Sequence, residues 1–415
     1  MEEFVATQIR YGLKYVPVNI IKSFFIPKSS DDTRALRSRG FIMGVCHPNE
    51  DYELLRGAGI RWVRFDVPFP FTAQGEPSPG YAAFRERCRG YAERGFSVMA
   101  VTPFPDAFIS AGIDPRTPED ESRIREVAEF LVRDLQGLVG GFQISNEAGL
   151  PKFTLPLTLD EAARFIGIQA EAMYPLRGEI LVGYNSGGPE AKLHALMRPY
   201  HRFCDYVGID VYLGCFAGLP GLMCLFPALL RYVWALTGRP VILQEFGYIG
   251  GGMPKSRRQK KELLRSYGLR SEKDAKRDIE KLVDKLPGSF RHFIEHDGRG
   301  DPARYYDLIF RSDYRQHFYK EMPRLTRVPG CEHSPEGQAR FFSDLIPRLY
   351  RLPFVAGAMV YCWSDAETCG YCGQSDCPVE TRWGLVDSAG RPKPSYHAVK
   401  ERFFDIARSE EEKRS

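Results

Sequence analysis

The stretch VILQEFGYIG, Val241–Gly250, decides how the rest of the sequence is organised. It is an apolar run that ends in a carboxylate, Glu245, followed by an aromatic residue and a glycine. A short apolar run of this kind is typical of a buried strand whose last side chain points out of the sheet into a cleft. The stretch GGFQISNEAGL (140–150) has the same pattern, an apolar run followed by Asn146 and by Glu147, which lies ninety-eight residues before Glu245. Both stretches predict a strand that delivers a glutamate to the end of a sheet.

Six further apolar runs extend this pattern in both directions along the chain. The eight predicted strands are Phe41–Cys46, Trp62–Val67, Phe96–Thr102, Phe142–Ser145, Ile180–Tyr184, Tyr206–Tyr212, Val241–Glu245 and Val355–Trp363. Helical patterns fill gaps between them, at Ala82–Glu93, Thr117–Leu138, Thr158–Met173, Pro189–Arg202 and Ser334–Arg351. Alternation of strands and helices predicts a parallel sheet with helical crossovers. Eight such units predict an α/β fold, the (β/α)8 or TIM barrel.

The barrel is predicted to occupy residues 39–407, after a tail, 1–38, that packs on it and before a charged, disordered tail, 408–415. This is many more residues than the roughly 250 that a barrel needs. Most of the excess, 250–333, lies between the seventh and eighth strands, where we expect a helical insertion that overhangs the rim as a lid. Its first part, 255–285, holds twelve Lys and Arg against six Asp and Glu. These charges fit a solvated helical surface or a clamp for an anionic group on a substrate.

The overall charge and composition limit the classes of partner that the protein is expected to bind. A net charge of +4 is small, and the basic segment lacks a nucleic-acid-binding motif, so nucleic acid is not an expected partner. Residues 11–27 are basic and apolar, and fit packing on the barrel or contact with a membrane surface. The apolar window Ala217–Leu236 contains Pro220, Pro227 and Arg231, which favours a helix of the barrel over a transmembrane segment. Such a helix also permits contact with an amphiphilic group on a ligand.

Ten cysteines without a recognisable signal peptide indicate reduced thiols and a cytoplasmic location. Cys362, Cys369, Cys372 and Cys377 crowd into sixteen residues. The last three, with Cys331 at the end of the insertion, are candidate ligands of a structural zinc ion that pins the insertion to the rim. Free thiols and a disulfide are the alternatives. The sequence says nothing about oligomeric state.

The carboxyl ends of all the strands in a parallel barrel meet at one rim, so the polar residues at strand ends should come together there. A pair of carboxylates, one acid/base and one nucleophile, is what glycoside hydrolysis uses. The full set resembles that of clan A of the glycoside hydrolases, the retaining (β/α)8 enzymes. The matching positions are Asn146, Glu147, Glu245, Arg64, Tyr212 and Trp363, and Thr381–Phe403 is similar to the clan's segment between strand eight and the last helix. The resemblance covers about 40–405, apart from the insertion.

The resemblance implies double displacement on a β-linked glycoside, with Glu147 as acid/base, Glu245 as nucleophile, and neither cofactor nor catalytic metal. The other implied roles are to hold Glu245 ionised (Arg64, Tyr212), to bind the sugar 2-hydroxyl (Asn146) and to offer a flat face to the sugar (Trp363), with His47 and Asn185 as further candidate sugar contacts. Structural alternatives stay open, such as pairing of Arg64 with Asp66 or ordinary packing of Tyr212. A non-catalytic barrel that binds a sugar or a partner, and a transglycosylase on the same scaffold, are the alternative functions.

Overall fold

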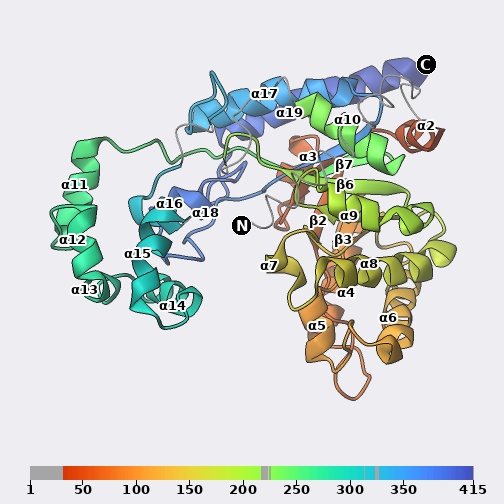
Figure 1. Ribbon diagram of the computed structural model, residues 1–415. Coiled ribbons are helices and arrows are strands. Elements are labelled where there is room, and N and C mark those ends of the chain that lie inside the picture. The colour runs from red at the N-terminus through yellow and green to blue at the C-terminus, as the bar shows by residue number, and fades with distance from the viewer. Residues whose placement is uncertain (1–30, 216–222, 224–225, 313, 323–326, 415) are drawn as a thin grey trace.

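The computed structural model describes residues 31–414 apart from 216–222, 224–225, 313 and 323–326, and its core is the predicted barrel (Figure 1). Eight parallel strands close into a ring in chain order, each paired with the next and β8 with β1. The strands are β1 (Ile42–Cys46), β2 (Trp62–Asp66), β3 (Ser97–Val101), β4 (Gly141–Ile144), β5 (Leu181–Ser186), β6 (Tyr206–Val211), β7 (Val241–Phe246) and β8 (Val355–Val360). All eight match predicted strands to within a few residues.

Helices cover the outside of the ring. They are α3 (Tyr52–Gly57), α4 (Pro79–Ala92), α5 (Pro105–Ser110), α6 (Glu121–Asp134), α7 (Pro151–Thr154), α8 (Leu159–Met173), α9 (Ala191–Leu196), α10 (Phe226–Thr237), α17 (Pro335–Arg351) and α19 (Pro394–Arg414). The predicted helix Pro189–Arg202 is divided into α9 and a 3-10 turn, Arg198–Phe203.

Local sequence explains where the helices begin. The predicted capping box at the start of α8 is present: the Glu161 backbone N–H donates to the Thr158 hydroxyl, and the Thr158 backbone N–H donates to the Glu161 carboxylate at 2.7 Å. Ser78 caps α4 by accepting the N–H of Tyr81. Between the helices and the strands lies one continuous core of buried apolar side chains.

The predicted helical insertion is present between β7 and β8. It consists of α11 (Arg257–Ser266), α12 (Glu272–Arg277), α13 (Ile279–Val283), α14 (Gly288–Asp297), α15 (Pro302–Arg311) and α16 (Tyr314–Tyr319). In Figure 1 these helices form a separate lobe on the same side of the barrel as α7 and α18 (Pro378–Thr381), which follow β4 and β8. The insertion therefore stands on the side where the strands end. The basic segment 255–285 forms α11, α12 and α13.

The predicted disordered tail 408–415 is wrong for the residues that the structure describes. Helix α19 continues to Arg414 and packs along α17. Glu410 accepts the backbone N–H of Phe41 at 2.9 Å, and Lys413 donates to the Tyr350 hydroxyl at 2.8 Å. Charged residues therefore extend the helix because their side chains have partners on the barrel.

Two other predicted segments lie partly outside the described residues. Of the N-terminal tail, only α2 (Asp31–Ser38) is described, and there Arg37 donates to the backbone carbonyl of Val355 at 2.8 Å. The basic, apolar segment 11–27 lies outside. In the window Ala217–Leu236, α10 begins at Phe226 and buries Leu230, Val233 and Trp234. No helix in the described part of the chain has the length and apolar character to span a membrane.

Candidate active site

A buried arginine is at the centre of the rim. Arg64, on β2, is 1% exposed, and its guanidinium donates to Gln143 Oε1 at 2.6 Å and to Asn146 Oδ1 at 2.7 Å. It also forms an ion pair with Glu245 Oε1 at 2.7 Å. Burial alone would lower the pKa of Arg64, but the charge of Glu245 and its neighbours outweighs burial and raises it. The alternative pairing with Asp66 is not adopted, and Arg64 joins β2, β4 and β7 at the site.

Glu245 is held through both of its carboxylate oxygens. Arg64 binds Oε1, while the Tyr212 hydroxyl donates to Oε2. Burial, followed by the negative charge of Glu245, raises the pKa of Tyr212 well above its usual value, so this hydroxyl keeps its proton and stays a donor. Two donors, one of them positively charged, therefore hold a carboxylate that is only 7% exposed. The predicted trio of Arg64, Tyr212 and Glu245 is therefore brought together.

Glu147 is placed by its backbone. Its N–H donates to Asn185 Oδ1 at 2.7 Å, and the Asn185 amide donates in turn to Asp210 Oδ1 at 2.7 Å. Asn185 is fully buried by these contacts, so it positions Glu147 and the prediction of a direct sugar contact is not supported. The side chain of Glu147 is half-buried and lies so close to Gly187 that a β-carbon there would be 3.2 Å from Glu147 Oε1.

The backbone at the rim adopts conformations that side chains disfavour. His47, Ser145 and Glu147 have φ angles of 50°, 61° and 38°. Positive φ in residues other than glycine is uncommon and costs about 1–3 kcal/mol, and such residues concentrate at functional sites. Three of the five described non-glycine residues with this conformation lie at the ends of β1 and β4, where the site is.

The charges of the two predicted catalytic acids reach the same neighbours. Burial raises the pKa of Asp210 well above its usual value, and the negative charges of Glu245 and then Glu147 raise it further. Both acids contribute in the same direction to the raised pKa of Tyr212. Asp210 is 3% exposed, pairs with Glu245 across β6 and β7, and has one oxygen, Oδ2, without a hydrogen bond. Glu147 and Glu245 thus act electrostatically on the same pair of side chains.

Asn146 and His47, two predicted sugar contacts, differ in exposure: Asn146 is 7% exposed, whereas His47 is open to solvent. Asn146 uses its oxygen to accept from Arg64 and from Gln143, which leaves its amide nitrogen without a partner among the described residues. His47 is exposed at the mouth of the site, with its ring edge-on to Tyr361 at 5.6 Å. Desolvation of the imidazole by the surrounding protein and, to a smaller extent, the positive charge of Arg64 lower the pKa of His47. At neutral pH a neutral imidazole and a free amide therefore face the rim.

The prediction that Trp363 offers a flat face to a sugar is wrong. Its side chain is 0% exposed and packs edge-on against Tyr396 at 6.2 Å. The cause is that β8 ends at Val360, three residues before the predicted end of the strand. The aromatic rings that border the site are instead Tyr361 and Trp383, which lie 5.5 Å and 5.3 Å from the Tyr212 ring.

Sequence reasoning also missed other residues of the site. Gln143 bridges Arg64 and Asn146, and its place as a polar residue inside the predicted strand Phe142–Ser145 was a usable signal. Glu190, 2% exposed, lies so close to Gly149 that a β-carbon there would be 1.6 Å from its carboxylate. Burial, followed by the charge of Glu147, raises the pKa of Glu190 well above its usual value. No local pattern marked Glu190, because it precedes a short helix without capping it.

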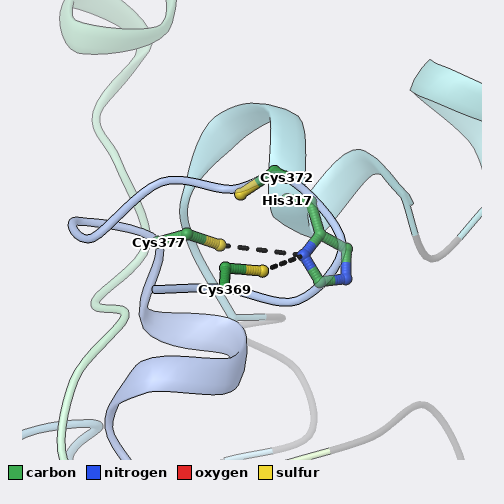
Figure 2. A group of neighbouring side chains, drawn as sticks. All are labelled: His317, Cys369, Cys372 and Cys377. Carbon is green, nitrogen blue, oxygen red and sulfur yellow. Dashed lines mark hydrogen bonds between the residues drawn. The ribbon is translucent and has the colours of Figure 1, made fainter. Parts of the chain in front are cut away.

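The cysteine cluster differs in one member from the predicted zinc site. Cys369, Cys372 and Cys377 come together as predicted (Figure 2). The fourth member of the cluster is His317, so the prediction of Cys331 as the fourth ligand is wrong. Cys331 is buried elsewhere, where its backbone carbonyl accepts from the Tyr248 hydroxyl at 2.6 Å.

Comparisons with known proteins support the barrel. No protein-family model and no curated protein sequence matches the chain. Among solved structures it is similar to a family 39 glycoside hydrolase from Bacteroides cellulosilyticus WH2 (TM-score 0.54, 15% identity, 91% of this chain and 65% of that one). It is similar also to the GH53 catalytic domain of Ignisphaera aggregans (0.52, 17%, 86% and 95%) and to a beta-glucuronidase from an uncultured Clostridium species (0.50, 16%, 86% and 46%).

The chain thus spans about half to two thirds of the length of the first and third of these proteins. At such identities the similarity is one of fold. It confirms the predicted (β/α)8 barrel.

Proposed function

We propose that this protein is a retaining glycoside hydrolase that cleaves a β-linked glycoside by double displacement. In this proposal Glu245 is the nucleophile and Glu147 the acid/base. The observation that carries the proposal is the way in which Glu245 is held, with Arg64 on one oxygen and Tyr212 on the other. A nucleophilic carboxylate has to be ionised and fixed in direction before it can attack the anomeric carbon, and these two donors do both.

The same geometry favours retention over inversion. An inverting enzyme uses its second carboxylate as a base that activates a water molecule, and needs room for that water. Glu245 is 7% exposed and both of its oxygens already accept from protein donors. Such a carboxylate suits direct attack on carbon better than removal of a proton from water.

Glu147 suits the proton-transfer role because its position is fixed while its side chain stays half-open to solvent. The Asn185 amide holds the backbone, and the strained φ of 38° directs the side chain. An acid/base catalyst gives a proton to the leaving oxygen and then takes one from water, so it needs contact with both. A half-buried carboxyl at the rim meets that need.

The remaining rim residues fit a carbohydrate. The free amide of Asn146 can donate to a sugar hydroxyl, and a hydrogen bond to the 2-hydroxyl that strengthens in the transition state is a known part of this chemistry. The neutral imidazole of His47 supplies a further polar contact. Tyr361, beside it, offers an aromatic ring in the place that we first expected Trp363 to fill.

The decisive experiment combines a screen of aryl glycosides with substitution of the nucleophile. We expect Glu245→Ala to abolish turnover of the best substrate, and added azide or formate to restore it as a glycosyl azide or formate of inverted configuration. The matched control is Glu272→Ala. Glu272 also accepts from a tyrosine and an arginine, Tyr319 at 2.6 Å and Arg315 at 2.9 Å, but it lies in the insertion, and its loss should leave turnover unchanged.

A mechanism-based fluorosugar separates the proposal from its rivals. It should label the peptide that contains Glu245, and a crystal structure of the labelled protein should place the two carboxyl groups about 5–5.5 Å apart, against about 6.5–9.5 Å for an inverting enzyme. Sugar binding without labelling would indicate a non-catalytic barrel. Labelling followed by transfer to an added sugar rather than to water would indicate a transglycosylase. Unchanged turnover by Glu245→Ala would refute the assignment.

A further inference from the structure

Four side chains with metal-binding atoms converge where the insertion meets the loop after β8 (Figure 2). His317 lies on α16, and Cys369, Cys372 and Cys377 lie between β8 and α18. All four are buried, and their ligand atoms lie within 4.8 Å of one another. Two segments that are more than fifty residues apart in the sequence therefore contribute to one cluster.

The separations match those around a tetrahedral zinc ion. Zinc binds sulfur at about 2.3 Å and nitrogen at about 2.0–2.1 Å, so a thiolate and an imidazole on one tetrahedral ion lie about 3.6 Å apart. His317 Nδ1 lies 3.4 Å from Cys369 Sγ and 3.7 Å from Cys377 Sγ. An ion at the centre of the group therefore needs little movement of these side chains.

The backbone turn between the first two cysteines is shaped to aim both at one point. Gly373 follows Cys372 with a φ of +65°, and its N–H donates to the carbonyl of Cys369 at 2.8 Å. The Cys369 N–H donates to the carbonyl of Gln374 at 3.1 Å. A side chain at Gly373 would be strained, and its β-carbon would approach Ser289 Oγ to 2.4 Å. The turn is therefore constrained by hydrogen bonds and by the insertion against which it packs.

The surroundings keep water away from the cluster. The ring of Tyr371 packs on the His317 imidazole at 5.0 Å, and that of Phe290 lies 6.4 Å from it. Outside this shell, Lys320 binds both oxygens of Asp376, at 2.6 Å and 2.7 Å, across the same two segments. A closed apolar shell of this kind limits solvent access and orients the metal ligands.

We propose that His317, Cys369, Cys372 and Cys377 bind one structural zinc ion that fastens the insertion to the rim of the barrel. A disulfide would use two of the thiols and leave the third thiol and the imidazole without a role, whereas a zinc ion uses all four groups. Three thiolates and one imidazole complete a tetrahedral shell, so no position is left for a water or a substrate and the ion is not catalytic. The proposal does not depend on the glycosidase function.

The zinc-bound loop is connected directly to the candidate active site. It begins just after Tyr361 and ends just before Trp383, and these two rings pack on Tyr212. Tyr212 in turn donates to Glu245. The ion therefore lies within the loop whose two flanking aromatic rings pack on the tyrosine.

Metal analysis of the full chain tests the proposal. Protein purified in a thiol reductant without chelator should contain about one zinc ion per chain by mass spectrometry. His317→Ala and Cys372→Ser should lose the ion, while His317→Cys should keep it, because a fourth thiolate also completes the shell. Two controls, Cys331→Ser and His296→Ala, alter a buried cysteine and an exposed histidine of the insertion and should retain the ion.

Cobalt exchange of the wild-type protein covers the case in which a variant does not fold. Cobalt(II) in this site should show the visible absorption of tetrahedral coordination together with charge-transfer bands from its thiolates. Removal of zinc by a strong chelator should lower the midpoint of thermal unfolding, and zinc should restore it. A wild-type protein that contains no zinc and takes up neither metal would overturn the proposal. So would a Cys372→Ser protein as rich in zinc as the wild type.

Discussion

Replacing Tyr212 by Phe isolates one hydrogen bond at the candidate nucleophile. The hydroxyl donates to Glu245 Oε2, while the ring packs on Tyr361 and Trp383. Phe keeps the ring and removes only the hydroxyl. A hydrogen bond to a charged group contributes about 1.5–3 kcal/mol. If this bond holds the nucleophile in the direction of attack, kcat/KM should fall by about 10- to 150-fold.

The assay is hydrolysis of the best aryl glycoside from the screen, with the free energy of unfolding measured in parallel. The matched control is Tyr81→Phe, which removes a tyrosine–carboxylate bond of 2.7 Å to Asp134, between the outer helices α4 and α6. Asp134 keeps its ion pair with Arg85, so the control should lose at most about 1.5–3 kcal/mol of stability and no activity. A Tyr212→Phe protein within about threefold of the wild-type kcat/KM would refute the reasoning.

Three further predictions concern the acid/base, the buried histidines and the corrected tryptophan. Asn185→Leu removes the amide that holds the backbone of Glu147. It should slow most the cleavage of glycosides with poor leaving groups, because their departure depends most on a donated proton. A plot of the logarithm of the rate against the pKa of the leaving group should therefore become steeper. Burial lowers the pKa of His194 to about 3 and of His201 to about 4, whereas the unfolded chain titrates near 6.5. The unfolded state therefore binds more protons below pH 6.5, and the free energy of unfolding should fall by roughly 2 kcal/mol per histidine between about pH 7 and about pH 5. Denaturant titrations should find this pH dependence in the wild type and not in the double variant His194→Gln/His201→Gln. Trp363→Phe should lower the free energy of unfolding by about 1–3 kcal/mol and leave KM unchanged, because the indole is buried; a raised KM with unchanged stability would restore the role of sugar platform.

Much of the barrel was predictable because each strand leaves a local signal. Apolar runs such as Val241–Glu245 are bounded by glycine and polar residues, and their ends differ from the observed strands by one or a few residues. Glu245 and Arg64 were predictable for a related reason. A charged residue inside or at the end of a fully buried strand needs a partner, and the closed ring brings the two together.

The errors arise where the outcome depends on contacts distant in the sequence. Nothing local shows that Trp363 turns inward, because that depends on where β8 stops. His317 precedes the first cysteine of its cluster by more than fifty residues, and the intervening helices decide that it reaches the thiols. The tail after residue 407 looked unstructured by composition, but contacts of α19 with α17 and with Phe41, just before β1, keep it helical as far as Arg414.

The closure of the ring between β1 and β8 has a consequence for biosynthesis. About 110 residues separate the end of β7 from the start of β8. At roughly 5–20 residues per second, the ribosome needs about 5–20 s to add them, and for that time β1 and β7 can present open edges to other nascent chains. Chaperone dependence during synthesis should therefore grow with the length of the insertion, and shortening it should raise the soluble yield.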